Sequence, residues 1–311
     1  MKRIQILSIV LMAIVLASCN TNPSSSNSEI VKAKQVPLED FFKNPDKSGY
    51  QISPNGDYYS YSAPYESRMN VYIQKRGEAE SIRLTSETDR DIAGYFWPND
   101  EQIVYLKDTG GDENYRLYVV NIDGTNNVCL TDFEGVRTQI IDDLPEQKDF
   151  MIVGLNKRNP QVFDPYRLNL KTGEMQMIAE NPGNIQGWML DHEGNLRIAI
   201  AIVDGINQSI LYRKTEADEW KTILTTNFKE GFSPQFFTFD NKNIIGTSNL
   251  GRDKSAVVEF NPETGEEVQI LYKNNDYDVS YVSYSRKRKV ITAASYTGWK
   301  RERHFFDPLT E

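Results

Sequence analysis

Serine and histidine are the residues of this chain that could support hydrolysis, so their sequence contexts come first. A nucleophilic serine exposed at a strained strand-to-helix turn needs the pattern Gly-x-Ser-x-Gly. The nearest match, Gly246-Thr-Ser-Asn-Leu250, has leucine where the second glycine belongs, and Gly231-Phe-Ser-Pro-Gln235 fails as well. Neither His192 nor His304 has a nucleophile placed to pair with it. We therefore predict no catalytic residue in these 311 residues.

Residues that bind metals or phosphates are too few and too scattered to predict a cofactor site. Two histidines without a carboxylate cluster at ligand spacing argue against zinc. Thr109-Gly-Gly-Asp112 has the sequence of a hairpin turn rather than of a phosphate-binding loop. Cys129 lies in a strand-like context without a partner cysteine, so we interpret it as a small buried hydrophobic residue. The prediction is no cofactor and no metal.

Cys19 is the residue whose context indicates a covalent modification. An apolar run, Ile4 to Leu16, follows two basic residues and is too short to span a bilayer comfortably. Leu16-Ala-Ser-Cys19 comes directly after it and closely resembles a lipobox. That resemblance implies cleavage before Cys19 and a diacylglycerol on its sulfur. The alternative is an ordinary secretory signal with an incidental cysteine.

These residues predict a lipoprotein signal peptide over 1–18 and a flexible tether over 19–35, because Asn20 to Ser28 is rich in serine and asparagine. We expect a lipid-anchored protein of a bacterial cell envelope, facing the periplasm or the cell surface. The formal net charge is −9, and no stripe of lysine and arginine offsets it. An acidic chain of this kind argues against a nucleic-acid partner.

The rest of the chain repeats, and the repeat must position any functional residue. Similar strand-like segments recur along the chain, and each runs into a turn. We call the equivalent residue of each segment its anchor, and successive anchors are separated by 46, 48, 46, 46 and 46 residues. The anchors are Tyr72, Tyr118, Tyr166, Tyr212, Val258 and His304. Two further strands precede each anchor, and a closing strand follows it in five of the units. A short helical turn from Leu38 to Lys43 precedes the first repeat.

Four short strands in about 46 residues is the size of one blade of a β-propeller. We therefore predict an all-β fold, a β-propeller of four-stranded blades over residues 36–311. A β-sandwich is the rival, but it has no reason to keep a constant period. The repeats begin near Ile52, Tyr95, Thr138, Ile185, Phe232 and Val279. The sixth has room for only three strands, so we expect the chain to be a fragment or a reading frame that ends early.

Several segments together resemble the N-terminal half of prolyl oligopeptidase family serine peptidases, in the acylaminoacyl-peptidase and dipeptidyl-peptidase branch. They are Pro37–Pro45, Ile52–Gly56, Asp108–Asn114 and Tyr296–Glu302, and the resemblance covers about residues 36 to 311. In that family a propeller, usually of seven blades, screens substrates by size and precedes an α/β-hydrolase with a Ser-Asp-His triad. The resemblance implies a propeller truncated before its hydrolase, with peptides as substrates of the whole enzyme.

Charged loop residues are the candidates for recognition. In a blade, the hairpins between second and third strands and the links between blades open on the same face. In the prolyl oligopeptidase family, which this chain resembles, one face of the propeller borders the cavity that it shares with the hydrolase. We predict that charges of these segments contact peptide termini or the partner domain, the alternative being solvated loop charges. The candidates are Arg90, Arg137, Asp112, Glu113, Arg252 and Arg301. Arg90 and Arg137 lead, because arginine can hold a carboxylate bidentately.

Aromatic residues favour strands and fill the wedge between blades, so we interpret Trp97, Trp188 and Trp299 as core. Two functions from different classes follow from these observations. The first is the non-catalytic, substrate-gating portion of an exported serine peptidase. The second is a free-standing propeller lipoprotein that binds a protein or glycan in the envelope.

Overall fold

The computed structural model describes residues 33–311, in two units that we treat separately. The first ends at Lys43 and holds one short helix, α2 (Leu38–Phe42), where the sequence predicted a helical turn. The second, Asn44–Glu311, holds all the strands. The predicted signal peptide, Cys19 and most of the tether lie outside the described residues. No helix within residues 33–311 is long and apolar enough to cross a membrane.

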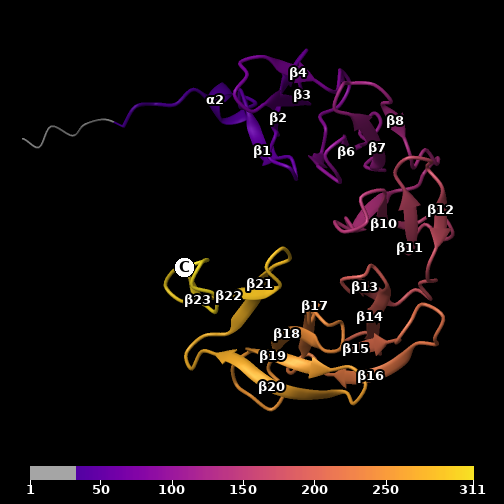
Figure 1. The fold of residues 1–311 in the computed structure, drawn as a ribbon, viewed down its shortest axis with the longest axis vertical. Helices are drawn as coiled ribbons and strands as arrows, with labels where there is room; N and C mark the ends of the chain where they lie inside the picture. The colour runs from indigo at the N-terminus through magenta and orange to yellow at the C-terminus, as the bar shows by residue number, and fades with distance from the viewer. Residues whose placement is uncertain (1–32) are drawn as a thin grey trace, which may run out of the picture. The chain divides into compact units, whose positions relative to one another are not determined.

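The second unit consists of six antiparallel sheets, which we call blades 1 to 6 in chain order (Figure 1). Blade 1 contains β1 (Ser48–Ile52), β2 (Tyr58–Tyr65), β3 (Arg68–Lys75) and β4 (Ser81–Arg83). Blade 2 contains β5 (Gly94–Phe96), β6 (Gln102–Lys107), β7 (Arg116–Asn121) and β8 (Val128–Cys129). Blade 3 contains β9 (Thr138–Asp142), β10 (Phe150–Leu155), β11 (Asp164–Asn169) and β12 (Met175–Met177).

Blade 4 contains β13 (Ile185–Leu190), β14 (Leu196–Val203), β15 (Asn207–Tyr212) and β16 (Lys221–Thr226). Blade 5 contains β17 (Phe232–Phe237), β18 (Ile244–Ser248), β19 (Ala256–Asn261) and β20 (Glu266–Lys273). Blade 6 contains β21 (Val279–Ser285), β22 (Val290–Thr297) and β23 (Arg301–Phe305). In every blade the strands pair in chain order. The predicted propeller of four-stranded blades is confirmed, and the sixth blade has three strands, as its length predicted.

The second strand of each blade explains why the alternating pattern of an ordinary surface sheet is weak in this sequence. Residues of β10 from Met151 to Leu155 are all buried, as are all five residues of β18. A strand covered on both faces has no solvated side, so it carries a nearly continuous apolar run. Both faces of β10 and β18 are covered because blades 3 and 5 each pack against the blade before and the blade after.

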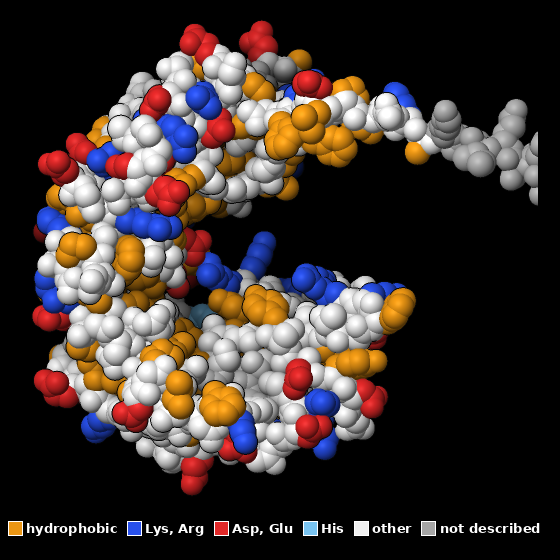
Figure 2. Space-filling view, turned by 180° about the vertical axis from the view of Figure 1, so that it is seen from behind, with side chains coloured by type: hydrophobic (Ala, Val, Ile, Leu, Met, Phe, Trp, Pro, Cys, Tyr) orange, Lys and Arg blue, Asp and Glu red, His pale blue; other side chains and the backbone are white. Residues whose placement is uncertain are grey.

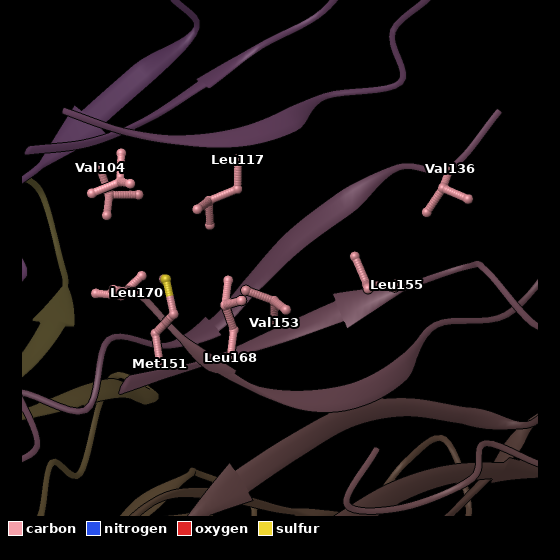
Figure 3. Close-up of a cluster of buried hydrophobic side chains, with 9 residues drawn as sticks. Val104, Leu117, Val136, Met151, Val153, Leu155, Leu168 and Leu170 are labelled. Carbon is pink, nitrogen blue, oxygen red and sulfur yellow. The ribbon is translucent and has the colours of Figure 1, made fainter. Parts of the chain in front are cut away.

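The core is accordingly divided among the interfaces between blades. One cluster joins β6 and β7 of blade 2 to β10 and β11 of blade 3 through Leu117, Met151, Val153 and Leu168, none of them exposed by more than 1% (Figure 3). Comparable clusters join blades 1 and 2, 3 and 4, 4 and 5, and 5 and 6. Each interface is built from residues of consecutive repeats, so the same kind of interface recurs from blade to blade as the repeat recurs in the sequence.

Gly246 shows why one apparent fragment of a catalytic motif is structural. It lies in β18 opposite Pro234 of β17. A Cβ placed on it would stand 2.3 Å from the carbonyl oxygen of Ser233 and 2.6 Å from the Phe232 ring. The position therefore requires glycine for close packing of the two strands.

The turns between first and second strands bind the corresponding turns of neighbouring blades. The amide of Asn55 donates to Asp100 of blade 2 at 2.8 Å, and the Asn99 side chain donates to the Lys148 carbonyl of blade 3 at 3.0 Å. Gln147 in turn donates to the Glu193 carbonyl of blade 4 at 2.6 Å. These polar contacts fix the turns of one face in a row.

The expectations that four individual residues are buried had different outcomes. Trp97 is buried, and its indole N–H donates to Ser60 Oγ at 2.8 Å, whereas Trp188 is half-buried against Trp220. The prediction for Trp299 was wrong, because this residue lies in the hairpin between β22 and β23 and is 99% exposed. Cys129, expected to be buried, is half-buried at the end of β8, where burial raises the pKa of its thiol.

We predict that Leu117→Ala will lower the free energy of unfolding by about 2–5 kcal/mol, because it leaves a cavity between blades 2 and 3. Leu309→Ala makes the same change at a side chain that is 83% exposed, and should shift that free energy by less than about 0.5 kcal/mol. Urea unfolding followed by circular dichroism measures both. Equal effects of the two substitutions would contradict the packing described here.

Candidate functional site

The links between blades and the hairpins between second and third strands touch one another, and together they form what we call the link face. Arg90, in the link from blade 1 to blade 2, pairs with Asp108 in the β6–β7 hairpin, with 3.1 Å between Nε and Oδ1. The amide of Arg137, in the next link, donates to Asn156 Oδ1 after β10 at 2.7 Å. Both predicted arginines therefore lie in segments of the link face.

Four of the six predicted residues gather around a single hairpin, Asp108 to Tyr115. The guanidinium of Arg90 stands over Gly111, and that of Arg137 lies 5.6 Å from the centre of the Tyr115 ring. Asp112 stabilises the hairpin by accepting from the amides of Thr109 and Asn114, at 3.2 and 3.1 Å. Glu113 has a φ of 55° and is exposed. The hairpin thus presents two carboxylates flanked by two guanidinium groups.

Arg252 and Arg301 belong to other blades and do not join this group. Arg252 in blade 5 makes a bidentate ion pair with Glu267 of β20, at 2.7 Å for each N–O distance, and also donates to the Ser248 carbonyl. These contacts of its side chain stabilise its own blade. Arg301 begins β23 in blade 6 and is exposed. The role predicted for these residues stays a prediction.

The two histidines lie among aromatic rings rather than beside a serine. The His192 ring bonds to the Phe237 carbonyl through Nε2 at 2.8 Å and stacks on Phe239. His304 stacks on Tyr272 with 4.1 Å between ring centres. Within residues 33–311, no three histidine, cysteine or acidic side chains come close enough together to hold a metal ion.

The structure also contains a pocket that the sequence did not predict, of about 260 Å³, which we call the central pocket. It lies where the turns between first and second strands of blades 3 to 6 converge, on the side of the blades opposite the link face. Figure 2 shows a hollow in this part of the molecule with basic, acidic and apolar side chains on its wall. Its lining includes Asp142, Leu144, Met189, His192, Gln235, Phe236, Phe239, Tyr284, Arg286 and Lys289.

Arg286 of the central pocket connects blade 6 to blade 3. Arg286 Nη1 lies 3.6 Å from Asp143 Oδ1, and Arg286 Nε donates to the Tyr284 hydroxyl at 3.2 Å. Burial raises the pKa of the neighbouring Asp142, even though this carboxyl accepts the Leu144 amide. The recurring turns were visible in the sequence, but nothing in it indicated that four of them meet around one hollow.

Comparisons with known proteins agree with this architecture. No family model matches the chain. It is 28% identical over 273 residues to dipeptidyl aminopeptidase BIII of Pseudoxanthomonas mexicana, covering 85% of this chain and 39% of that protein. It is also 26% identical over 290 residues to dipeptidyl peptidase family member 6 of Caenorhabditis elegans, covering 86% of this chain and 38% of that protein. The chain thus spans about two fifths of the length of these curated relatives.

Solved structures with a similar fold include dipeptidyl peptidase 4 of Porphyromonas gingivalis, with a TM-score of 0.56, 11% identity, and coverage of 85% of this chain and 45% of that one. A prolyl endopeptidase matches with a TM-score of 0.52, 12% identity, and coverage of 85% and 40%. The chain therefore has a β-propeller fold similar to the propellers of these structures. More particularly, the resemblance to the propeller part of prolyl oligopeptidase family peptidases is confirmed.

The ion pair of Arg252 and Glu267 gives a testable dependence on pH. Burial alone would raise the pKa of Glu267, but hydrogen bonds from Arg252 and Ser248 outweigh it, and the pKa is lowered. A carboxyl whose pKa is lowered by folding stabilises the fold above its ordinary value of 4.5, and loses that contribution as pH falls through the folded-state pKa.

We therefore expect Arg252→Met to lower the free energy of unfolding by about 1–3 kcal/mol at pH 7, and by less at pH 3. Lys242→Met, which breaks an exposed pair with Asp240, should cost less than about 1 kcal/mol at either pH. Urea titrations at the two pH values measure this. A loss of equal size at both would show that the ion pair is not what Arg252 contributes.

Proposed function

We propose that this chain is the propeller portion of an exported peptidase of the dipeptidyl-peptidase type, where it screens and orients peptides for a hydrolase domain. The observation that carries the proposal is the 28% identity to a dipeptidyl aminopeptidase across nearly the whole blade region. That similarity reaches 39% of the relative's length, which leaves room in such a protein for a separate catalytic domain.

The chemistry assigns the catalytic work to a domain other than this propeller. Acyl transfer by a serine needs a histidine base within hydrogen-bond reach and backbone N–H groups for the oxyanion. Among residues 33–311, both histidines are engaged with aromatic rings, and the serine-containing motif nearest to a nucleophile turn, around Gly246, is a closely packed strand. In our proposal, a hydrolase segment encoded after Glu311 supplies the triad.

The link face supplies the recognition in this proposal. The hairpin from Asp108 to Tyr115 presents Asp112 and Glu113, whose carboxylates suit the ammonium group of a peptide N-terminus. Arg90 is half-exposed but already paired with Asp108, whereas Arg137 is exposed and rests only on the Tyr115 ring. Arg137 is therefore the arginine better placed to bind a peptide carboxylate.

We expect the purified 311-residue chain not to react with a fluorophosphonate probe, which labels activated serines, and not to cleave dipeptidyl or acylaminoacyl chromogenic substrates. A longer product that includes the coding sequence after Glu311 should regain both reactions. If no hydrolase segment is encoded there, the free-standing binding protein becomes the better account. Stoichiometric labelling of the 311-residue chain, lost on mutation of one of its own serines, would mean that it holds a site.

We also propose that Cys19 is lipidated and anchors the protein to the envelope, supported by the Leu16-Ala-Ser-Cys19 pattern after a short apolar run. Cys19→Ser should move the protein from the membrane fraction of its host to the soluble envelope fraction. Ser18→Ala, which keeps the modified sulfur, should leave it in the membrane fraction. Immunoblotting of the separated fractions measures the change, and unchanged membrane association of Cys19→Ser would refute the anchor.

A further inference from the structure

A second hollow lies on the link face, where blades 3 and 4 meet, and we call it the amide cleft. It has a volume of about 500 Å³, within the range of about 300–1,000 Å³ that is usual for ligand sites. β9 and β13 contribute its walls, and the β10–β11 hairpin and the link from blade 3 to blade 4 complete it. None of the described residues that line the cleft carries a charged side chain.

Three glutamine side chains of the amide cleft have unused hydrogen-bonding groups. Gln139, Gln161 and Gln186 are exposed, and within residues 33–311 their side-chain amides make no hydrogen bond. The indole N–H of Trp188, which is half-buried and lines the same cleft, has no partner among these residues either. Each glutamine amide has two N–H donors and a carbonyl acceptor. The cleft therefore presents donors and acceptors together without a net charge.

The two walls of the amide cleft are strands with one unpaired edge. β9 is the last strand in the sheet of blade 3, and β13 is the first in the sheet of blade 4, on its inner side (Figure 1). A strand at the end of a sheet keeps a row of backbone N–H and C=O groups on its free edge. The side chain of Asn181 fixes the start of β13, because it donates to the Ile185 carbonyl at 2.9 Å and accepts the Ile185 amide at 3.1 Å. The walls are thus held in place for another extended chain to pair with them.

The charges around the amide cleft are paired or lie outside it. Asp164, which follows Phe163 of the lining, is fully buried and forms a bidentate pair with Arg158, at 2.9 Å for each N–O distance. Arg137, to which we assign a peptide carboxylate, is exposed and precedes Gln139 by two residues. A charged group inside the cleft would lose water without gaining an opposite charge, which costs free energy. The lining therefore favours an uncharged occupant.

We propose that the amide cleft binds an uncharged segment of a peptide in an extended conformation. The peptide backbone pairs with the free edge of β9 and with the glutamine amides, and an apolar side chain packs on Ile140, which is 38% exposed, and on Trp188. A peptide is favoured over a neutral sugar because strand edges repeat their donors and acceptors at the spacing of an extended chain. The inference rests on the proposed function and deepens it, since it names the part of the link face that holds the substrate and the side chains accepted there.

Isothermal titration calorimetry of the full chain with the blocked peptide acetyl-Ala-Leu-Ala-amide tests the proposal. The matched probes carry aspartate or lysine in place of leucine, and a fourth probe is the leucine peptide methylated at its three residue nitrogens, which removes those backbone donors. We expect the leucine peptide to bind at least about tenfold more tightly than each of the other three. No binding of the leucine peptide at millimolar concentration, or equal affinity for all four probes, would overturn the proposal. Binding of maltotetraose in place of the peptide would overturn it as well.

Variants locate the binding. Gln139→Leu and Gln186→Leu should each weaken binding of the leucine peptide by about three- to tenfold, because each removes one amide partner. Gln176→Leu is the matched control, the same change at an exposed residue of β12 outside the cleft, and should leave the affinity unchanged. Thermal unfolding of each variant confirms that it is folded. Unchanged affinity in folded Gln139→Leu and Gln186→Leu would place the binding elsewhere and refute the cleft.

Failure of the amide cleft and failure of the proposed function give different results. If the chain binds none of the peptides while a longer product cleaves dipeptidyl substrates, the cleft is refuted and the peptidase proposal stands. If the leucine peptide binds as expected while no hydrolase segment is encoded after Glu311, the peptidase proposal fails. The cleft then stands as the binding site of a free-standing propeller.

Discussion

Packing of one sheet against the next is the interaction on which the rest of this molecule depends. A sheet of four short strands cannot shield two apolar faces by itself, and the buried second strands, such as β10 and β18, make each blade apolar on both sides. Neighbours must therefore follow at a fixed distance. Once they do, all turns of one kind emerge on one side and all links on the other. The link face and the central pocket are consequences of that arrangement rather than separately built features.

The two sides of the blades are held together by different kinds of contact. On the link face, ion pairs such as Arg90 with Asp108, and Arg252 with Glu267, tie loops to their own or the adjoining blade. On the other side, backbone carbonyls and amide side chains connect one turn to the next, and aromatic rings fill the space between them.

The blades could be predicted because a blade is local in sequence: its strands pair in chain order, and the period of about 46 residues repeats the same interface. Predictions from residue type were wrong where the position of a residue within its blade decides whether it is buried. Trp299 has the residue type of a core position, yet it falls in a hairpin and is exposed. The hairpin around Asp112 was identified, because charges and glycines mark it. The central pocket was not, because its lining comes from four turns that belong to four different repeats.

The contact between Asp143 and Arg286 has a consequence for how the chain folds. Most partners in this unit lie in the same blade or the next one, so early blades can form while later ones are still being synthesised. The Asp143–Arg286 pair is different, because it joins the third blade to the sixth. It can form only after every blade between them is in place. The contact between Asp143 and Arg286 is thus a late event in folding, and a loosened blade anywhere from the third to the sixth would disturb it.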